Sequence, residues 1–261
     1  MALRIMSYNI WKGGEERLPH IAQVIQQQQP DVVALLEANS RENAEQLATQ
    51  LHMQLIFGES NGKSHVAWLS RLPVVHTENY KLPILHKTLL EIEISWGNTT
   101  NTTNTTNTTL PLFATHLRAG RWEDDEHYRV SELRAILEVL AHFRERPHAI
   151  MGDLNSIHPQ DQTGKHIVLP ARASIPTEAE EQRLPRLAIP ELLNAGYVDC
   201  YRKLHPHEQD YTFKLPQPWL RLDYLFATPS LAEHLQQCEV VTSAEARVAS
   251  DHLPIWAEFA D

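Results

Sequence analysis

Short apolar runs that end in a charged or amide side chain recur along this chain. Examples are the run Val32–Leu36 before Glu37 and the run Ala149–Met151 before Gly152-Asp153. Runs of this length are typical of β-strands, and a continuous apolar run is typical of a strand buried on both faces. Strand ends are where layered α/β proteins assemble their sites. The pattern therefore predicts a layered sheet protein with a polar site at one edge.

Stretches with helical periodicity lie between these runs. Apolar side chains at helical spacing predict helices over Glu15–Gln29 and Glu123–Arg144. Ser40 is a predicted N-cap for a further helix that ends near Leu51. A length of 261 residues and a hydrophobic content of 42% suit one large α/β domain over 1–261, and no domain boundary is visible.

Two segments interrupt the pattern. Residues 98–109 are four Asn-Thr-Thr triplets between the predicted strands Lys87–Trp96 and Leu110–His116. Loop-closure entropy grows slowly with length, so we expect an inserted loop at a hairpin tip whose deletion leaves folding and catalysis intact. Residues 157–185 are polar and irregular. A loop of that length inside one domain is typical of a lid or a disordered insert, and we expect it to border the site.

The balance of charge limits the binding partners. The formal net charge is −10, from 33 acidic and 23 basic residues. Strong sequence-independent binding of DNA needs a basic footprint, which argues against that activity, although a locally positive groove would permit it. The apolar N-terminal stretch is too short for a signal peptide, and no run reaches the roughly 18 apolar residues of a membrane helix. We therefore expect a cytoplasmic monomer without stable membrane insertion.

The polar residues at the predicted strand ends form a chemically coherent set. It comprises four carboxylates, two amides and two imidazoles: Asn9, Glu37, His116, Asp153, Asn155, Asp223, Asp251 and His252. Carboxylates supply the oxygen ligands that Mg²⁺ takes. Amides and imidazoles donate hydrogen bonds to phosphoryl oxygens. The set therefore indicates a site for a divalent cation and a phosphate ester.

The order of these motifs resembles the endonuclease/exonuclease/phosphatase superfamily, the deoxyribonuclease I-like hydrolases. The motifs are Asn9, Glu37, His116, Gly152-Asp153-Leu154-Asn155, Asp223-Tyr224 and Ser250-Asp251-His252. The resemblance covers Met6 to Phe259, nearly the whole chain. It implies a four-layer α/β sandwich, in which two packed mixed sheets are flanked by helices, and a Mg²⁺-dependent attack of water on a phosphoester. It leaves the substrate open, because one fold serves many reactions.

The candidate metal ligands are Glu37 and Asp251, with Asn9 as a further ligand or a substrate contact. Mg²⁺ retains several waters, so one or two carboxylates with a substrate oxygen suffice, and Mn²⁺ is a possible substitute. Some DNA-repair members of the superfamily carry a second acidic residue two positions after the first Asn. Trp11 occupies that position here, which favours one metal over two.

The candidate catalytic residues are Asp153, Asn155, His116, His252 and Asp223. Asp153 and Asn155 lie two apart, so in an extended segment their side chains point the same way. In the superfamily this Asp acts as the general base and this Asn contacts the phosphate. His252 and Asp223 resemble its His–Asp pair, in which the carboxylate fixes the imidazole tautomer. In some mechanisms the imidazole is the base instead, and that choice stays open. His116 matches a position that contacts the scissile phosphate.

Several substrates are compatible with these residues. Arg118, in the loop after His116, is a candidate phosphate clamp because its planar fork matches phosphate geometry. The leading hypothesis is a Mg²⁺-dependent phosphodiesterase or endonuclease-like hydrolase. The alternative is a small-molecule or lipid phosphatase or phosphodiesterase of the inositol or sphingolipid type. A catalytically inactive binding scaffold is a remote alternative, because every expected residue is present.

Overall fold

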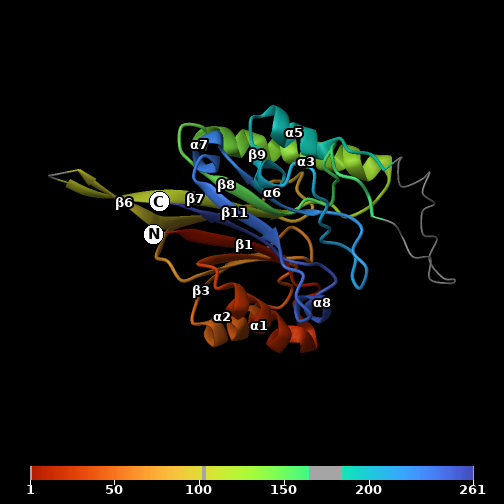
Figure 1. Cartoon of the computed structure of the whole chain (residues 1–261), viewed down its shortest axis with the longest axis horizontal. Helices are drawn as coiled ribbons and strands as arrows, with labels where there is room; N and C mark the ends of the chain where they lie inside the picture. The colour runs from red at the N-terminus through yellow and green to blue at the C-terminus, as the bar shows by residue number, and fades with distance from the viewer. Residues whose placement is uncertain (1, 102–103, 165–183, 261) are drawn as a thin grey trace.

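Two six-stranded sheets pack face to face, and helices cover the outer side of each (Figure 1). The structure is a computed structural model, and it describes residues 2–101, 104–164 and 184–260. The layers run helix, sheet, sheet, helix, with α1 and α2 on one side of the molecule and α3 and α5 on the other. The expected four-layer α/β sandwich is therefore confirmed.

The first sheet contains both ends of the chain. Its strand order is β11 (Leu235–Val240), β12 (Ile255–Phe259), β1 (Leu3–Asn9), β2 (Val32–Leu36), β4 (Val66–Ser70) and β3 (Gln54–Gly58). Only β1 and β2 pair in parallel, and the other neighbours are antiparallel. The helices on its outer side are α1 (Leu18–Gln28), α2 (Arg41–Leu51) and the short α8 (Ala246–Ala249).

The second sheet is built around another parallel pair, β7 and β8. Its strand order is β5 (Val74–Tyr80), β6 (Leu89–Asn101), β7 (Asn104–His116), β8 (Ala149–Asp153), β10 (Asp223–Ala227) and β9 (Val198–Asp199). Helices α3 (Glu123–Leu140) and α5 (Ala188–Asn194) cover it. The short helices α6 (Cys200–Leu204) and α7 (Pro229–Ala232) flank β10, and the 3₁₀ turns are η1 (Glu15–Arg17) and η2 (Ala141–Phe143).

Local sequence accounts for most of these elements. All five residues of β2 are buried, as expected for its continuous apolar run. Ser40 caps α2, because its hydroxyl oxygen accepts a hydrogen bond from the Asn43 amide at 3.1 Å. The helix predicted from Glu15 instead begins with η1, and α1 starts at Leu18 with a proline in its first turn. Proline suits that position, where its missing N–H costs nothing.

The Asn-Thr-Thr repeat continues a β-hairpin, whereas we expected it to form an inserted loop at the hairpin tip. The backbone of Asn98–Asn101 pairs in register with that of Asn104–Asn107, which extends β6 and β7. β-Branched threonine favours extended backbone, and this explains how the repeat can lengthen the ladder. The hairpin projects from the left-hand end of the molecule in Figure 1. Residues 102–103 lie outside the described residues, as does most of the expected irregular segment, 165–183.

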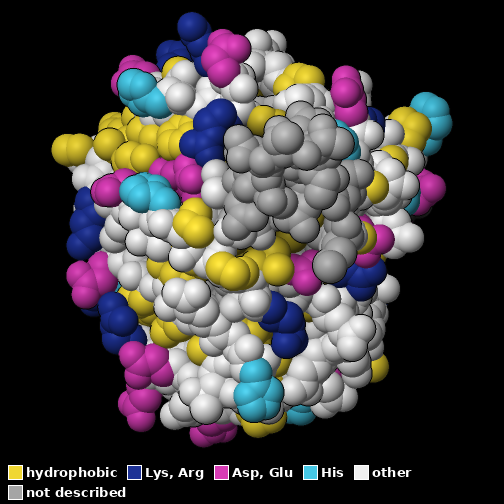
Figure 2. All heavy atoms as spheres, turned by 90° about the vertical axis from the view of Figure 1, so that its left-hand side faces the viewer, with side chains coloured by type: hydrophobic (Ala, Val, Ile, Leu, Met, Phe, Trp, Pro, Cys, Tyr) yellow, Lys and Arg dark blue, Asp and Glu magenta, His cyan; other side chains and the backbone are white. Residues whose placement is uncertain are grey.

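The end of the molecule that carries the hairpin has mixed charge. Figure 2 shows Lys and Arg side chains among Asp and Glu on this face, with no broad region of one sign. Across the described part of the chain, no helix combines the length and the apolar character needed to cross a membrane.

Candidate active site

Three strands of the second sheet bring three polar side chains into one row. His116 ends β7 and pairs in register with Asp153 at the end of β8. Asp223 begins β10 and is the antiparallel partner of Asp153. Side chains in register point to the same face of a sheet, so the three groups adjoin. The His116 Nε2 lies 3.4 Å from the Asp153 Oδ2, and all three residues are buried.

The first sheet supplies the opposite wall of the site. Asn9 ends β1, and Glu37 follows β2, its parallel neighbour. The Asn9 Nδ2 donates to the Asp153 Oδ2 at 3.0 Å and lies 3.5 Å from the Glu37 Oε1. One amide therefore bridges carboxylates from the two sheets. Glu37 adopts φ 57°, and the Lys12 amide holds its side chain by donating to Oε2 at 3.0 Å. Such a backbone in a non-glycine residue persists only where its surroundings enforce it.

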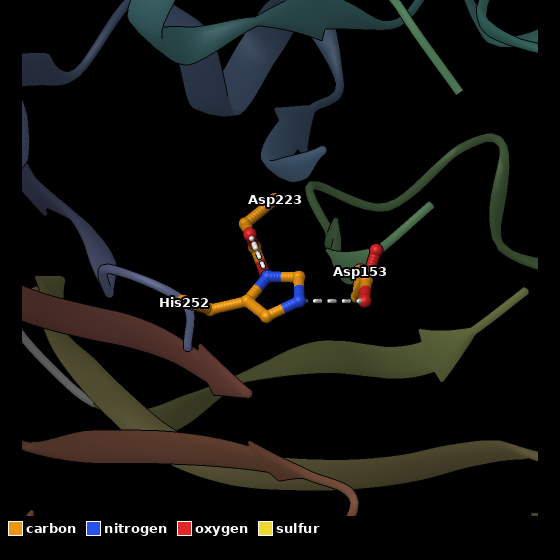
Figure 3. A group of neighbouring side chains, drawn as sticks. All are labelled: Asp153, Asp223 and His252. Atoms are coloured by element: carbon orange, nitrogen blue, oxygen red, sulfur yellow. Dashed lines mark hydrogen bonds and ion pairs between the residues drawn. The ribbon is translucent and has the colours of Figure 1, made fainter. Parts of the chain in front are cut away.

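The loop before β12 places His252 between two carboxylates (Figure 3). The His252 Nδ1 lies 2.8 Å from the Asp223 Oδ2, and its Nε2 lies 3.7 Å from the Asp153 Oδ2. The Ser250 hydroxyl ties this loop to the first sheet by donating to the Asn9 carbonyl at 2.7 Å. The predicted His–Asp pair is thus present, and the same loop carries the half-buried Asp251.

The buried setting gives the two imidazoles different charge states. Burial alone lowers the pKa of His252, but the carboxylates of Asp223 and Asp153 outweigh it and raise the pKa to about 9. His252 is therefore a cation at neutral pH. Burial lowers the pKa of His116 well below its ordinary value, and the positive charges of Lys87 and His252 lower it further. His116 is therefore neutral.

Asp153 is a carboxylate whose ionisation is opposed by its position. Burial raises its pKa, the neighbouring Asp223 raises it further, and the cations of His252 and Lys87 act in the opposite sense. The backbone N–H of Asn155 donates to its Oδ1 at 3.0 Å. The two Asp153 oxygens are thus held by different partners, which fixes the plane of the carboxylate.

A tight turn sets the position of Asn155. Gly152 adopts φ +146°, and a Cβ there would lie 1.8 Å from the Thr115 carbonyl oxygen, so no larger residue fits. Asn155 itself adopts φ 49°, a conformation that asparagine tolerates better than most residues. Its Nδ2 donates to the Leu117 carbonyl at 3.2 Å. The side chain accordingly points toward the end of β7, beside His116.

Arg118 is placed at the site's edge with its charge already engaged. Its Nε donates to the Asp125 Oδ1 at 2.9 Å, and its guanidinium lies 4.8 Å from the centre of the Tyr128 ring. The side chain is 40% exposed. A phosphate that bound Arg118 would have to compete with or share this carboxylate.

Two residues near the site were not among the predicted site residues. Lys87 is buried, and its Nζ donates to the Leu117 carbonyl at 2.6 Å. Glu132, on the buried face of α3, accepts from the backbone amides of His86 and Arg118, each at 2.8 Å. A charged residue on the apolar face of a predicted helix was the available signal for Glu132. Lys87 stood at the end of a predicted strand, where solvent exposure is the usual state.

Two sets of side chains can be considered as ligands for a metal ion. Among the described residues, Asp153, Asp223 and His252 present ligand atoms within 4.8 Å of one another. His252 is already held by both carboxylates and is a cation, so this set suits a proton donor better than Mg²⁺. The Asp251 Oδ1 is buried without a hydrogen-bond partner in the described structure. Burial is the main cause that raises the pKa of Asp251, and the negative charge of Glu37 raises it further. Two neighbouring carboxylates, one with an orphaned oxygen, fit a hard cation.

Comparison with known proteins identifies the family of this chain. A model of the Endonuclease/Exonuclease/phosphatase family matches residues 6–252. The chain belongs to this family. Exodeoxyribonuclease III of Haemophilus influenzae is 25% identical over 292 residues, covering 98% of this chain and 100% of that protein. Membership and the site together identify a phosphoester hydrolase.

Solved structures of similar fold include an AP endonuclease and a 3′-5′ exonuclease. An AP endonuclease from Archaeoglobus fulgidus has a TM-score of 0.75 at 20% identity, covering 99% of this chain and 100% of that one. A 3′-5′ exonuclease from Neisseria meningitidis has a TM-score of 0.75 at 18% identity, with coverage of 99% and 100%. At these identities the likeness establishes the fold of this family member.

Proposed function

We propose that this family member is a Mg²⁺-dependent phosphodiesterase that cleaves nucleic acid by attack of water on phosphorus. The observation that carries the proposal is Asp153, buried and in reach of Asn9, His116 and His252. Glu37 and Asp251 would hold the ion, with the Asn9 oxygen as a further ligand. When bound, Mg²⁺ polarises the phosphate and offsets its charge.

We assign the general base to Asp153. A base works best when its pKa lies near the working pH, and burial moves the pKa of Asp153 in that direction. His252 is the competing candidate, but the adjacent carboxylates keep it protonated. A protonated imidazole cannot accept a proton from water, whereas it can donate to a phosphoryl oxygen as negative charge develops.

His116 and Asn155 are the proposed neutral donors to the phosphate. In the described structure the His116 Nδ1 has no hydrogen-bond partner, and in the tautomer that carries its proton on Nδ1 this nitrogen would donate to a phosphoryl oxygen. The Asn155 amide uses one N–H on the Leu117 carbonyl and retains a second. Asp223 acts through His252, whose orientation and positive charge it stabilises.

Nucleic acid is the proposed substrate because the similar proteins named above are an exodeoxyribonuclease, an AP endonuclease and a 3′-5′ exonuclease. A small-molecule or lipid phosphoester is the second candidate. It is favoured by the net charge of −10 and by the pairing of Arg118 with Asp125. We further propose that the protein acts in the cytoplasm as a monomer. Light scattering of the purified chain would check its oligomeric state.

The deciding experiment measures Mg²⁺-dependent hydrolysis of two substrate groups in parallel. One group is plasmid DNA and an oligonucleotide with an abasic site, and the other is a panel of small phosphoesters. Asp153→Asn serves as the control for a contaminating nuclease. DNA cleavage that disappears in this variant supports the proposal. Turnover of small esters with intact DNA would support the second candidate, and inactivity on both groups would refute the proposed function.

A further inference from the structure

A buried lysine stands beside the site with no part in the reaction described so far. Lys87 lies just before β6 and is 6% exposed. Its Nζ donates to the Leu117 carbonyl at 2.6 Å, and the described residues offer this ammonium no second hydrogen bond. Lysine is rarely buried without a charged partner. Packing alone therefore does not explain why the Lys87 ammonium is buried here.

The Leu117 peptide connects this lysine to the proposed catalytic residues. Its carbonyl accepts both the Lys87 ammonium and the Asn155 Nδ2, the latter at 3.2 Å. Its N–H donates to the Asp153 carbonyl at 3.0 Å. The ammonium and the Asn155 amide thus converge on one oxygen at the end of β7. Any change at Lys87 that moves this peptide also moves Asn155.

A purely structural ion pair does not account for Lys87. The buried carboxylate on α3 whose charge acts on Lys87 is Glu132, and its two oxygens accept from the backbone amides of His86 and Arg118. In the described part of the chain Lys87 forms no salt bridge. Burial lowers the pKa of Lys87, and the negative charges of Asp153, Glu132 and Glu37 act against that lowering.

An ammonium carries three N–H donors, and leaving buried donors without acceptors is costly. One Lys87 donor is used on Leu117. The remaining donors have no acceptor among the described residues, and the charge of Lys87 acts on the pKa of both His116 and Asp153. A phosphoryl oxygen within reach of the ammonium would supply the missing acceptor and a compensating negative charge.

We propose that Lys87 is a substrate-binding residue whose ammonium donates to a non-bridging oxygen of the scissile phosphate while it fixes the Leu117 carbonyl that orients Asn155. The inference rests on the proposed phosphodiesterase function and adds a fixed cation to the groups assigned there. The proposed contact is to a non-bridging oxygen, so it does not depend on the leaving group of the substrate.

The test compares Lys87→Met, Lys87→Arg and Lys203→Met with the wild-type chain. Lys203 is a matched control, because its Nζ also donates to a backbone carbonyl, that of Ala232, but from α6 and outside the site. The readouts are kcat and KM on the active substrate, the thermal midpoint, and inhibition by inorganic phosphate. We expect Lys87→Met to lower kcat by about 100-fold or more. Phosphate inhibition should weaken in the same variant. Lys87→Arg should keep most of the wild-type kcat and phosphate inhibition, and Lys203→Met should match wild type in both.

A folded Lys87→Met variant with near wild-type kcat and phosphate inhibition would overturn the inference. A wild-type chain inactive on every phosphoester would instead refute the proposed function. If Lys87→Met does not fold, the wild-type chain labelled with ¹⁵N-lysine is titrated with inorganic phosphate and Mg²⁺, and the Lys87 signal is identified by its loss in Lys87→Arg. A shift of that signal supports the inference, and an unchanged signal contradicts it.

Discussion

At the scale of single residues, the site shows how neighbours decide what a side chain can do. His116 and His252 are both buried imidazoles beside Asp153. Only His252 has a second carboxylate, Asp223, at 2.8 Å. One histidine is therefore neutral and the other is a cation, although their exposure is almost the same. This difference assigns them separate tasks toward a phosphate.

The Asp223→Asn variant tests that assignment through the pH dependence of activity. In the wild-type chain His252 stays protonated until the pH rises past about 9, so activity should fall only above that value. Removing the carboxylate lowers the pKa of His252, and the basic limb of the kcat profile should move to lower pH. We also expect kcat at neutral pH to fall by about 10²–10⁴-fold. Asp124→Asn, an exposed change on α3, is the control. If the basic limb does not move, its pKa belongs to a group other than His252.

The proposed metal ligands are tested by the concentration of Mg²⁺ that the enzyme needs. Glu37→Gln and Asp251→Asn each remove one negative charge and one strong oxygen ligand, so half-maximal activity should require at least about 10-fold more Mg²⁺. Chelation should abolish wild-type activity, and added Mn²⁺ should restore it. Glu42→Gln, on the exposed side of α2, should behave as wild type. Equal Mg²⁺ requirements in all four proteins would exclude these ligands.

At the scale of elements, close packing of β7 against β8 sets the position of the site. The Gly152→Ala variant should be destabilised by about 3 kcal/mol or more, since its Cβ would meet the Thr115 carbonyl at 1.8 Å. Gly196→Ala is the matched control, because Gly196 also has a positive φ, +90°, but nothing lies within 4 Å of its Cβ position. It should lose only about 1 kcal/mol. Urea unfolding measures the stability of both variants. Equal losses would mean that the positive φ of Gly152, rather than the contact with Thr115, causes the destabilisation.

The hairpin should be dispensable, because its tip lies far from the proposed catalytic residues. Strand β7 runs 13 residues from Asn104 to His116, which corresponds to about 40 Å of extended chain. Thr109 must be kept, since its hydroxyl links Glu93 and Arg146. We expect deletion of Asn98–Asn107 to leave kcat/KM within about twofold of wild type and the thermal midpoint nearly unchanged. A large loss of activity would show that the hairpin takes part in substrate binding.

The sequence was most informative where burial and periodicity agree. The strand before Glu37 and the Ser40 cap follow from local patterns, whereas the expected His252–Asp223 pair came from the family resemblance. β3 and β11 were not predicted, because β3 is only partly buried and β11 alternates imperfectly around a bulge. Register is a non-local property, so the row of His116, Asp153 and Asp223 could be expected from the family resemblance but not from spacing.

At the scale of the whole molecule, charge should limit how tightly this enzyme binds the proposed nucleic-acid substrate. A net charge of −10 repels a polyanion, and the positive groups identified near the site are few, chiefly Lys87 and Arg118. A protein that neutralises six to ten phosphates loses about 10³–10⁵-fold in affinity between 50 and 200 mM salt, whereas two contacts predict a loss of about tenfold. We therefore expect the Kd of Asp153→Asn for an oligonucleotide to rise only about tenfold over that range. A loss of 10³-fold or more would reveal a basic groove that the net charge conceals. A Kd independent of salt would favour a small phosphoester as the substrate, since recognition would then be confined to the scissile phosphate and its immediate neighbours.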